Sequence, residues 1–352
     1  MYYSEKDEET GEYHQRRCFI TTDRDMAKHA DALIFHSTDL YRSYRNDMPT
    51  ERFSWQNWIF FTLEPPQFNR LGYDYYRKWI HSMKFNYTMS YSRFSDIQFP
   101  YGRTFDFPNE TQIQPNFIEN VRYRIENFVD SFQFRPKDAV WIVSDCDTMG
   151  KRENIVSQLV DLGMNIDTWG TCWDSMRPDQ VWKRFGTRRF FQQYRFYLAF
   201  ENALCEEYLT EKAFLGLHSS VNYGLIPIVY GYGNYSEYLP HGSYIDATKF
   251  PNATSLYKYL TKLTFDNEML ESFYRWQYHQ YIPNDKSWRV QNGLRNLCRH
   301  LHAKEILTPK YESVVVKQSN NSATIKNDVR SKIGACLWTA DFNAEKGNTF
   351  QL

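Results

Sequence analysis

The chain has 352 residues, of which 42% are hydrophobic and 24% charged, so it is globular and long enough for two domains. Lysine plus arginine and aspartate plus glutamate number 42 each, and this balance argues against binding nucleic acid through bulk phosphate attraction. The sequence has no apolar run of about 18 residues that could span a membrane, and residues 1–17 lack the apolar core of a signal peptide.

The cysteines and the N-glycosylation sequons give information on the cellular compartment of the protein. The 6 cysteines show no C-x-x-C spacing, which makes a zinc site an unfavoured interpretation. An even cysteine number combined with several Asn-x-Ser/Thr sequons favours a secretory compartment. The candidate N-glycosylation sites are Asn86, Asn109, Asn234, Asn252 and Asn320.

The first part of the chain mixes short apolar strands with loops. Residues 18–22 (CFITT) predict a short buried strand, and residues 25–38 predict a helix that runs into a second strand, ALIFHS. The aromatic strand WQNWIFFTLEPP (55–66) is stopped by two prolines, because proline lacks the N–H that a strand donates. Residues 85–91 predict another strand, and residues 113–132 predict a helix.

After a polar break at residues 135–138, strands and helices alternate regularly. The strands are 139–144, 196–202 and 226–231, and the helices are 151–163, 210–221 and 254–264. Such alternation predicts an α/β fold with a parallel sheet covered on both faces. We therefore predict one α/β domain over residues 1–134, a second over 135–313, and a polar tail over 314–352.

The stretch FYLAFENALCEEYLTEK (196–212) places a helix start after a buried strand. Thr210 is a good N-cap, and Glu211 and Lys212 lie in the first helical turn. Free backbone N–H groups at a helix N-terminus favour phosphate, and a lysine adds a positive charge there. The alternative is that the threonine only caps the helix and Glu211 only complements its dipole.

Two further segments contain candidate ligand-binding or catalytic residues. SDCDTMGKRE (144–153) follows a strand and opens a helix, so Lys151 or Arg152 could reach a phosphate, while its Asp-x-Asp triplet leaves a metal site as an alternative. Glu64 ends an apolar strand, where partial burial raises a carboxyl pKa toward that of a general base. The alternative is an ordinary turn glutamate.

Several of these segments resemble the α-1,3-fucosyltransferases. The stretch YRFYLAFENALCEEYLTEKAFLG, followed by GLIPIVYG and NYSEYLPHGSYIDATKF, is similar to the signature region of that family. Upstream, TTDRDMAKHADALIFHSTDL, WIFFTLEPP, FNYTMSYSRFSDIQFPYG and VWIVSDCDTMGKRE are similar to other family segments. The resemblance covers roughly residues 18–300, and the sequence looks most similar to invertebrate members of the family.

The resemblance implies a GT-B fold, in which two Rossmann-like domains face each other across a cleft. Residues 1–134 would bind the acceptor and residues 135–313 would bind GDP-fucose. The implied reaction transfers L-fucose from GDP-β-L-fucose to O3 of N-acetylglucosamine on glycoprotein glycans, in a single inverting displacement. Glu64 matches the catalytic base, Glu211 a ribose contact, Lys212 a pyrophosphate contact and Arg152 the arginine that neutralises the leaving GDP. The donor-binding set implied by the match is Arg152, Asn202, Tyr208, Glu211 and Lys212.

The same resemblance implies no required metal cofactor, with Mn²⁺ at most stimulatory, a place in the Golgi lumen and a homodimer. The sequence also departs from the family pattern. The usual anchor and first strand do not precede Cys18, Pro65 stands where members have serine, and Cys298 lacks a C-x-x-C partner. These departures leave an alternative, a catalytically silent member that binds glycans or a partner protein. The acceptor, core N-glycan or outer arm, also stays open.

Overall fold

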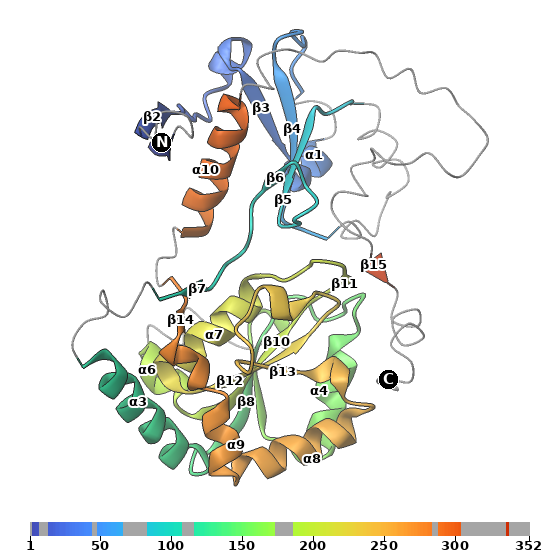
Figure 1. The fold of residues 1–352 in the computed structure, drawn as a ribbon. Helices are drawn as coiled ribbons and strands as arrows, with labels where there is room; N and C mark the ends of the chain where they lie inside the picture. Colours follow the sequence, from blue (N-terminus) through green and yellow to red (C-terminus); the bar gives the residue numbers. More distant parts are fainter. Residues whose placement is uncertain are drawn as a thin grey trace. The chain divides into compact units, whose positions relative to one another are not determined.

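The computed structural model describes residues 2–6, 13–43, 48–65, 83–107, 116–172, 186–283, 288–303 and 336–337. They fall into two compact units (Figure 1). The first unit comprises residues 1–100 and 286–335, and the second comprises residues 101–285 and 336–352. Across the described ranges, none of the helices combines the length and the apolar character needed to cross a membrane.

The first unit contains a parallel sheet in the order β3-β4-β5-β6. Its strands are β3 (Ala32–His36), β4 (Asn57–Thr62), β5 (Tyr87–Ser90) and β6 (Ile97–Gln98). The other elements are the antiparallel pair β1 (Tyr2–Lys6) and β2 (Tyr13–Arg17), the 3-10 helix η1 (Arg24–His29), and the helices α1 (Ser37–Ser43) and α10 (Trp288–His302).

Helix α10 returns from late in the sequence to complete the core of the first unit. Its Leu297 packs with Ile59, Met89, Ile97 and Phe99. A Cβ at Gly293 would lie 2.1 Å from the Phe99 ring, so a glycine is needed where this helix meets that ring.

The predicted buried strand at residues 18–22 is wrong. These residues are not in a strand, and the side chains of Phe19 and Ile20 are 76% and 42% exposed. A short apolar run becomes a strand only when a neighbour pairs with it, and among the described residues β3 pairs with β4 alone. The helix predicted from residue 25 is the 3-10 helix η1.

The second unit contains a five-stranded parallel sheet in the order β13-β12-β10-β8-β9. Its strands are β8 (Lys137–Ile142), β9 (Ile166–Trp169), β10 (Tyr194–Phe200), β12 (Ile226–Tyr230) and β13 (Ile245–Asp246). The helices around it are α3 (Phe117–Phe132), α4 (Arg152–Asp161), α6 (Thr187–Phe191), α7 (Glu211–Tyr223), α8 (Ala253–Thr264) and α9 (Asn267–Ser272) (Figure 1). Short elements are β7 (Phe105–Asp106), β11 (Leu204–Cys205), β14 (Gln280–Tyr281), β15 (Cys336–Leu337), η4 (Tyr235–Glu237), η5 (Ala247–Lys249) and η6 (Arg275–Tyr278).

Alternate residues of β10 enter two different cores. Phe196, Leu198 and Phe200 join one core, with side chains of α3, α4 and α8. Tyr197 and Ala199 join the other, with side chains of α6 and α7. A strand buried on both faces reads as a continuous apolar run, which is how FYLAF appears in the sequence. The predicted α/β class, with two units built on parallel sheets, is confirmed.

The boundary between the units differs from the predicted one at residues 134 and 135. Helix α3 lies before that point, yet its buried face packs into a core of the second unit through Val121, Ile125, Phe128 and Phe132. The polar break that suggested the boundary is therefore a turn within the second unit, since Arg135 donates to the carbonyls of Tyr194 and Gly224.

Within the described ranges, disulfides at Cys18 and at Cys146 tie distant segments together. Cys18 and Cys298 join the segment after β2 to α10, with their Cα atoms 5.9 Å apart and a sequence separation of 280. Cys146 and Cys172 join the segments that follow β8 and β9, with Cα atoms 5.6 Å apart. Both separations are ordinary for disulfides.

Candidate functional site

The candidate site lies at the carboxyl edge of the sheet in the second unit. Residues 143–151 follow β8, and residues 201–210 follow β10, its neighbour in the sheet. The Gly150 N–H donates to the Asn202 carbonyl at 3.2 Å, which joins the two segments. Open α/β sheets bind ligands at this edge, because loops from adjacent parallel strands converge there.

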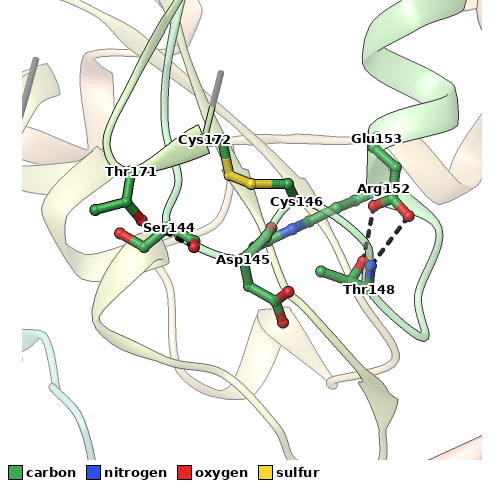
Figure 2. The surroundings of a disulfide bond; sticks show 8 residues. All are labelled: Ser144, Asp145, Cys146, Thr148, Arg152, Glu153, Thr171 and Cys172. Carbon is green, nitrogen blue, oxygen red and sulfur yellow. Dashed lines mark hydrogen bonds between the residues drawn. A yellow bond between two sulfur atoms is a disulfide. The ribbon is translucent and has the colours of Figure 1, made fainter. Parts of the chain in front are cut away.

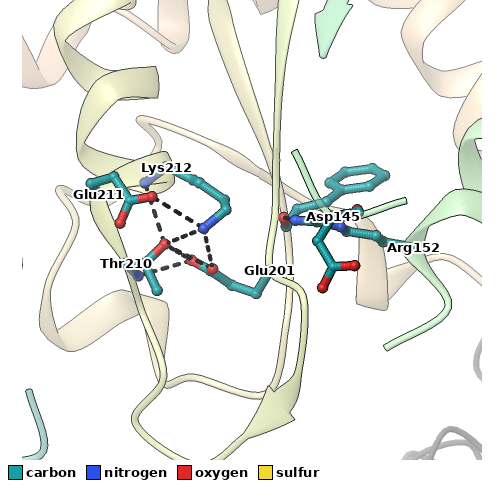
Figure 3. Close-up of polar contacts among 7 residues, drawn as sticks. Asp145, Arg152, Glu201, Thr210, Glu211 and Lys212 are labelled. Atoms are coloured by element: carbon teal, nitrogen blue, oxygen red, sulfur yellow. Dashed lines mark hydrogen bonds and ion pairs between the residues drawn. The ribbon is translucent and has the colours of Figure 1, made fainter. Parts of the chain in front are cut away.

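Glu201, Thr210 and Lys212 form a buried cluster at the start of α7 (Figure 3). The Thr210 N–H donates to Glu201 Oε1 at 2.8 Å, and the Thr210 hydroxyl contacts Oε2 at 2.8 Å. Lys212 Nζ lies 2.9 Å from Thr210 Oγ1 and 3.3 Å from Glu201 Oε2. Glu201 is fully buried, and the Lys212 side chain is 19% exposed. The cluster therefore holds an ammonium group at the first turn of the helix.

Burial and charge act on this pair in opposite directions. Burial raises the pKa of Glu201, against the effect of the Lys212 ammonium. Burial works to lower the pKa of Lys212, but the carboxylates of Glu201 and Glu211 outweigh it, and the pKa is raised, with Arg152 opposing them. Lys212 is thus kept charged by its neighbours.

Arg152 is buried, with 2% of its surface exposed. Its Nη1 donates to the Phe200 carbonyl at 2.6 Å, and its Nη2 donates to the Asp145 carbonyl at 3.0 Å. Its Nε is buried without a hydrogen-bond partner. Burial lowers the pKa of Arg152, and the carboxylates of Glu201 and Asp145 oppose that effect. The guanidinium therefore supplies positive charge behind the site while bracing two backbone segments.

The other three residues of the predicted donor set lie in the segments at this edge. The Asn202 Oδ1 atom is buried without a hydrogen-bond partner, so it offers an unused acceptor. Tyr208 is 2% exposed, and the Glu211 side chain is 57% exposed beside Lys212, at 3.2 Å. The structure thus places the predicted donor-binding residues on the loop after β10 and on the first turns of α4 and α7.

The backbone is strained immediately before two residues of this set. Lys151, next to Arg152, has a φ of 48°, and Glu207, next to Tyr208, has a φ of 61°. Side chains other than glycine rarely adopt this left-handed region, and such residues are enriched at functional sites. Tyr238 donates a short hydrogen bond to Glu207, which holds that strained residue in place.

The disulfide between Cys146 and Cys172 anchors the loop that leads into α4, whose first residue is Arg152 (Figure 2). Beside it, the Thr171 hydroxyl donates to the Ser144 carbonyl at 3.0 Å. At the far end of the loop, Glu153 accepts from the N–H of Thr148 at 3.0 Å. These contacts fix the loop at both ends.

The Asp-x-Asp triplet does not form a compact carboxylate cluster. Asp147 pairs with Lys151 at 2.8 Å on the surface, and the Asp145 carbonyl is engaged by Arg152. Within the described ranges, the group of metal-ligating side chains found is Cys18, Cys298 and His302, and its two cysteines are joined in a disulfide.

Glu64 lies at the corresponding edge of the sheet in the first unit, two residues after the end of β4. Its N–H donates to Thr62 Oγ1, and the Thr62 hydroxyl lies 3.2 Å from the Glu64 carbonyl. The Ser37 hydroxyl donates to the same threonine at 2.9 Å. The side chain is half-buried, and its role as the base stays a prediction.

Three of the sequons lie among the described residues. The Asn86 Oδ1 accepts from Arg52 and from the Trp58 N–H, each at 2.7 Å, so this amide is part of the fold. Asn234 is exposed, and Asn252 caps α8 through the Ser255 N–H at 2.8 Å. Asn109 and Asn320 lie outside the described residues.

The sequence motifs did not indicate a role for Glu201. The signal for it was present, because an ionisable residue directly follows an apolar strand and precedes a helix N-cap by nine positions. A fully buried carboxylate at such a place must be paired, which directs attention to Thr210 and Lys212.

Comparisons with known proteins show which family the chain is similar to. Residues 132–317 match the family described as glycosyltransferase family 10 (fucosyltransferase), C-terminal, and residues 3–102 match fucosyltransferase, N-terminal. The chain is 30% identical to alpha-(1,3)-fucosyltransferase C of Drosophila melanogaster, over 77% of this chain and 61% of that protein. It is 28% identical to human GDP-fucose protein O-fucosyltransferase 3, over 78% of this chain and 57% of that protein. A solved alpha1,3-fucosyltransferase with GDP is similar at 14% identity and a TM-score of 0.44, covering 80% of each chain. The match thus spans about three fifths of these two relatives.

Proposed function

The chain belongs to glycosyltransferase family 10, the fucosyltransferases, and on that premise we propose that it transfers L-fucose from GDP-β-L-fucose to O3 of N-acetylglucosamine on glycoprotein glycans. One observation carries the proposal. The ammonium of Lys212 is held at the N-terminal turn of α7 by Glu201 and Thr210, within the electrostatic reach of the Arg152 guanidinium. Such a site suits a nucleoside diphosphate.

The proposed reaction is a single displacement that inverts the anomeric carbon. Glu64 takes the proton of the acceptor hydroxyl, whose oxygen forms a bond to the anomeric carbon of fucose. The bond from that carbon to the β-phosphate oxygen breaks, and GDP leaves with the electron pair. Lys212 and Arg152 stabilise the charge that develops on the departing diphosphate, and two fixed cations can do this without a metal.

The replacement of Glu64 by glutamine tests the reaction. We expect Glu64→Gln to lower the transfer rate by about 10² to 10⁴-fold, because an amide cannot accept the proton, while GDP affinity stays at the wild-type level. Transfer from labelled GDP-fucose and calorimetric GDP binding provide the two measurements. The matched control is Glu51→Gln, an exposed glutamate of the same unit, which should leave both unchanged. Normal turnover of Glu64→Gln would remove that residue from the mechanism.

For the acceptor, the names of the relatives suggest two alternatives, a glycan and a protein hydroxyl. The Drosophila relative is named for an α-1,3 linkage, whereas the human relative is named for transfer to protein. A panel should contain a core N-glycan, N-acetyllactosamine and folded domains that present serine or threonine, with mass spectrometry of the products. Products on the glycans support the proposal, and products on protein hydroxyls alone replace its acceptor.

A catalytically silent member is the second candidate. It would bind GDP or glycans and leave every acceptor of the panel unmodified, even with GDP-fucose in excess. The sequence departure at Pro65 motivates it. GDP binding without any product would therefore favour this alternative over the enzyme.

We also propose that the reaction requires no metal, with Mn²⁺ at most stimulatory, and that the protein works in the Golgi lumen as a homodimer. The disulfides of Cys18 with Cys298 and of Cys146 with Cys172 support an oxidising compartment. Transfer that survives a chelator would support metal independence, and complete loss would favour an Asp-x-Asp metal site. Light scattering of the purified protein tests the dimer.

A further inference from the structure

We infer that Glu201 is a positioning residue of the proposed diphosphate site: its carboxylate holds the ammonium of Lys212, and the first turn of α7, in the geometry that receives the ligand. This inference rests on the proposed function, because it concerns the same site. It adds a residue to which neither the sequence motifs nor the site chemistry had given a role.

The contacts of Glu201 all converge on the start of α7. Oε1 accepts from the Thr210 N–H at 2.8 Å, and both carboxylate oxygens contact the Thr210 hydroxyl, at 3.0 and 2.8 Å. Oε2 lies 3.3 Å from Lys212 Nζ. Thr210 in turn caps the helix through the Lys212 N–H. One fully buried carboxylate therefore sets both the helix start and the position of the lysine side chain.

Burying a carboxylate costs free energy, and here its ion pair with Lys212 keeps the lysine charged. The charged groups that face Lys212 are Glu201 from the end of β10, Glu211 from α7 itself and Arg152 from α4. The Glu211 side chain is 57% exposed, so water screens its charge, whereas Glu201 is 1% exposed. Without Glu201, burial and the positive charge of Arg152 would both oppose the ammonium.

This arrangement prepares the site for an anion. A lysine has a flexible stem, and ordering it at the moment of binding costs conformational entropy. Glu201 and Thr210 fix that stem in advance, so a diphosphate meets a charged and oriented donor beside the helix N-terminus. The ligand class is a nucleoside diphosphate, for which GDP is the probe.

The test compares GDP affinity across pH in Glu201→Gln and in the wild-type protein. Glutamine keeps the volume and an acceptor oxygen for Thr210 but removes the charge. We expect the variant-to-wild-type affinity ratio to fall by about threefold or more as the pH rises from about 7.5 toward the ordinary lysine pKa of about 10. Burial acts to lower the pKa of Lys212, and without the charge of Glu201 to oppose that effect the variant loses the ammonium before the wild-type protein does. Taking the ratio cancels the ionisation of GDP itself.

Two companion variants separate positioning from simple structural support. Adding Lys212→Arg to Glu201→Gln should remove the pH dependence, because a guanidinium stays charged. Glu271→Gln, which removes an exposed ion pair with Arg275 at 3.2 Å, is the matched control and should behave as wild type. A Glu201→Gln ratio that does not change with pH would overturn the inference.

If Glu201→Gln does not fold, Glu201→Asp provides the measurement. Its shorter carboxylate withdraws from Lys212, so GDP affinity should fall, and wild-type affinity at every pH would again overturn the inference. Failure of the wild-type protein to bind GDP is a different result, because it would refute the proposed function itself.

Discussion

At the scale of single residues, the site depends on close approach between buried groups. Gly231 follows β12, and a Cβ there would lie 2.5 Å from the Tyr235 hydroxyl oxygen and 3.3 Å from Glu201 Cγ. The Tyr235 ring is 4% exposed, so it has little room to move. The absence of a side chain at Gly231 thus leaves the space that Glu201 occupies.

The substitution Gly231→Ala should disturb both stability and ligand binding. We expect the free energy of unfolding to fall by about 1–3 kcal/mol, because the added methyl overpacks this corner. GDP affinity should fall with it, since Glu201 must shift. Denaturant unfolding and calorimetry measure the two effects. Gly233→Ala is the control, because a Cβ there meets its nearest atom at 3.8 Å, and equal behaviour of the two variants would contradict the argument.

At the scale of elements, α7 depends on its N-cap. Thr210 is fully buried, and its hydroxyl serves Glu201, the Lys212 N–H and the Lys212 ammonium. Helix α7 packs closely on the sheet, where a Cβ at Gly216 would lie 2.9 Å from Pro227. The cap therefore links a packed helix to the charged groups at its end.

The substitution Thr210→Val tests this link. Valine has a similar shape but no hydroxyl, so we expect a loss of about 1–2 kcal/mol in the free energy of unfolding and weaker GDP binding. Thr210→Ser keeps the oxygen and should stay closer to wild type in both measurements. A valine variant as stable as the serine variant would show that the cap contributes little.

Some of these elements could be predicted from the sequence, and other features of the fold could not. The run FYLAF and the Thr-Glu-Lys start were sufficient to predict β10, α7 and the edge where they meet, because period and capping are local properties. The exposure of Phe19 was not predictable, since strand formation at residues 18–22 depends on a pairing partner far along the chain. Nor was the burial of Arg152 predictable, because its acceptors, the carbonyls of Phe200 and Asp145, come from the end of β10 and from the loop after β8.

At the scale of the whole molecule, buried phenols affect stability at alkaline pH. Burial raises the pKa of each member of a set of tyrosines in the second unit, so the folded protein keeps protons that the unfolded chain releases near its ordinary pKa of about 10. The folded state then binds more protons, and the free energy of unfolding must fall as pH rises above that value. The set is Tyr194, Tyr197, Tyr230 and Tyr274.

The slope of that fall can be measured in a variant. We expect Tyr197→Phe to reduce the loss of unfolding free energy by about 1.4 kcal/mol per pH unit above about pH 10, because one titrating group has been removed. Tyr123→Phe, at a ring that is 70% exposed, should leave the slope unchanged. Denaturant unfolding at several alkaline pH values gives the slopes. Identical slopes in both variants would exclude buried phenols as the cause.

The order in which the chain passes through the two units decides which fragments of the protein can be produced separately. Residues 101–285 run without interruption through the five-stranded sheet, its two cores and every residue of the proposed donor site. The first unit is assembled from two separated stretches, because α10 brings Leu297 back to Phe99 and is tied to Cys18. A fragment of residues 101–285 therefore contains both cores of the second unit and lacks only β15, the short partner of β11, among the described elements of that unit. A fragment ending at residue 100 would instead expose the apolar side chains that α10 covers.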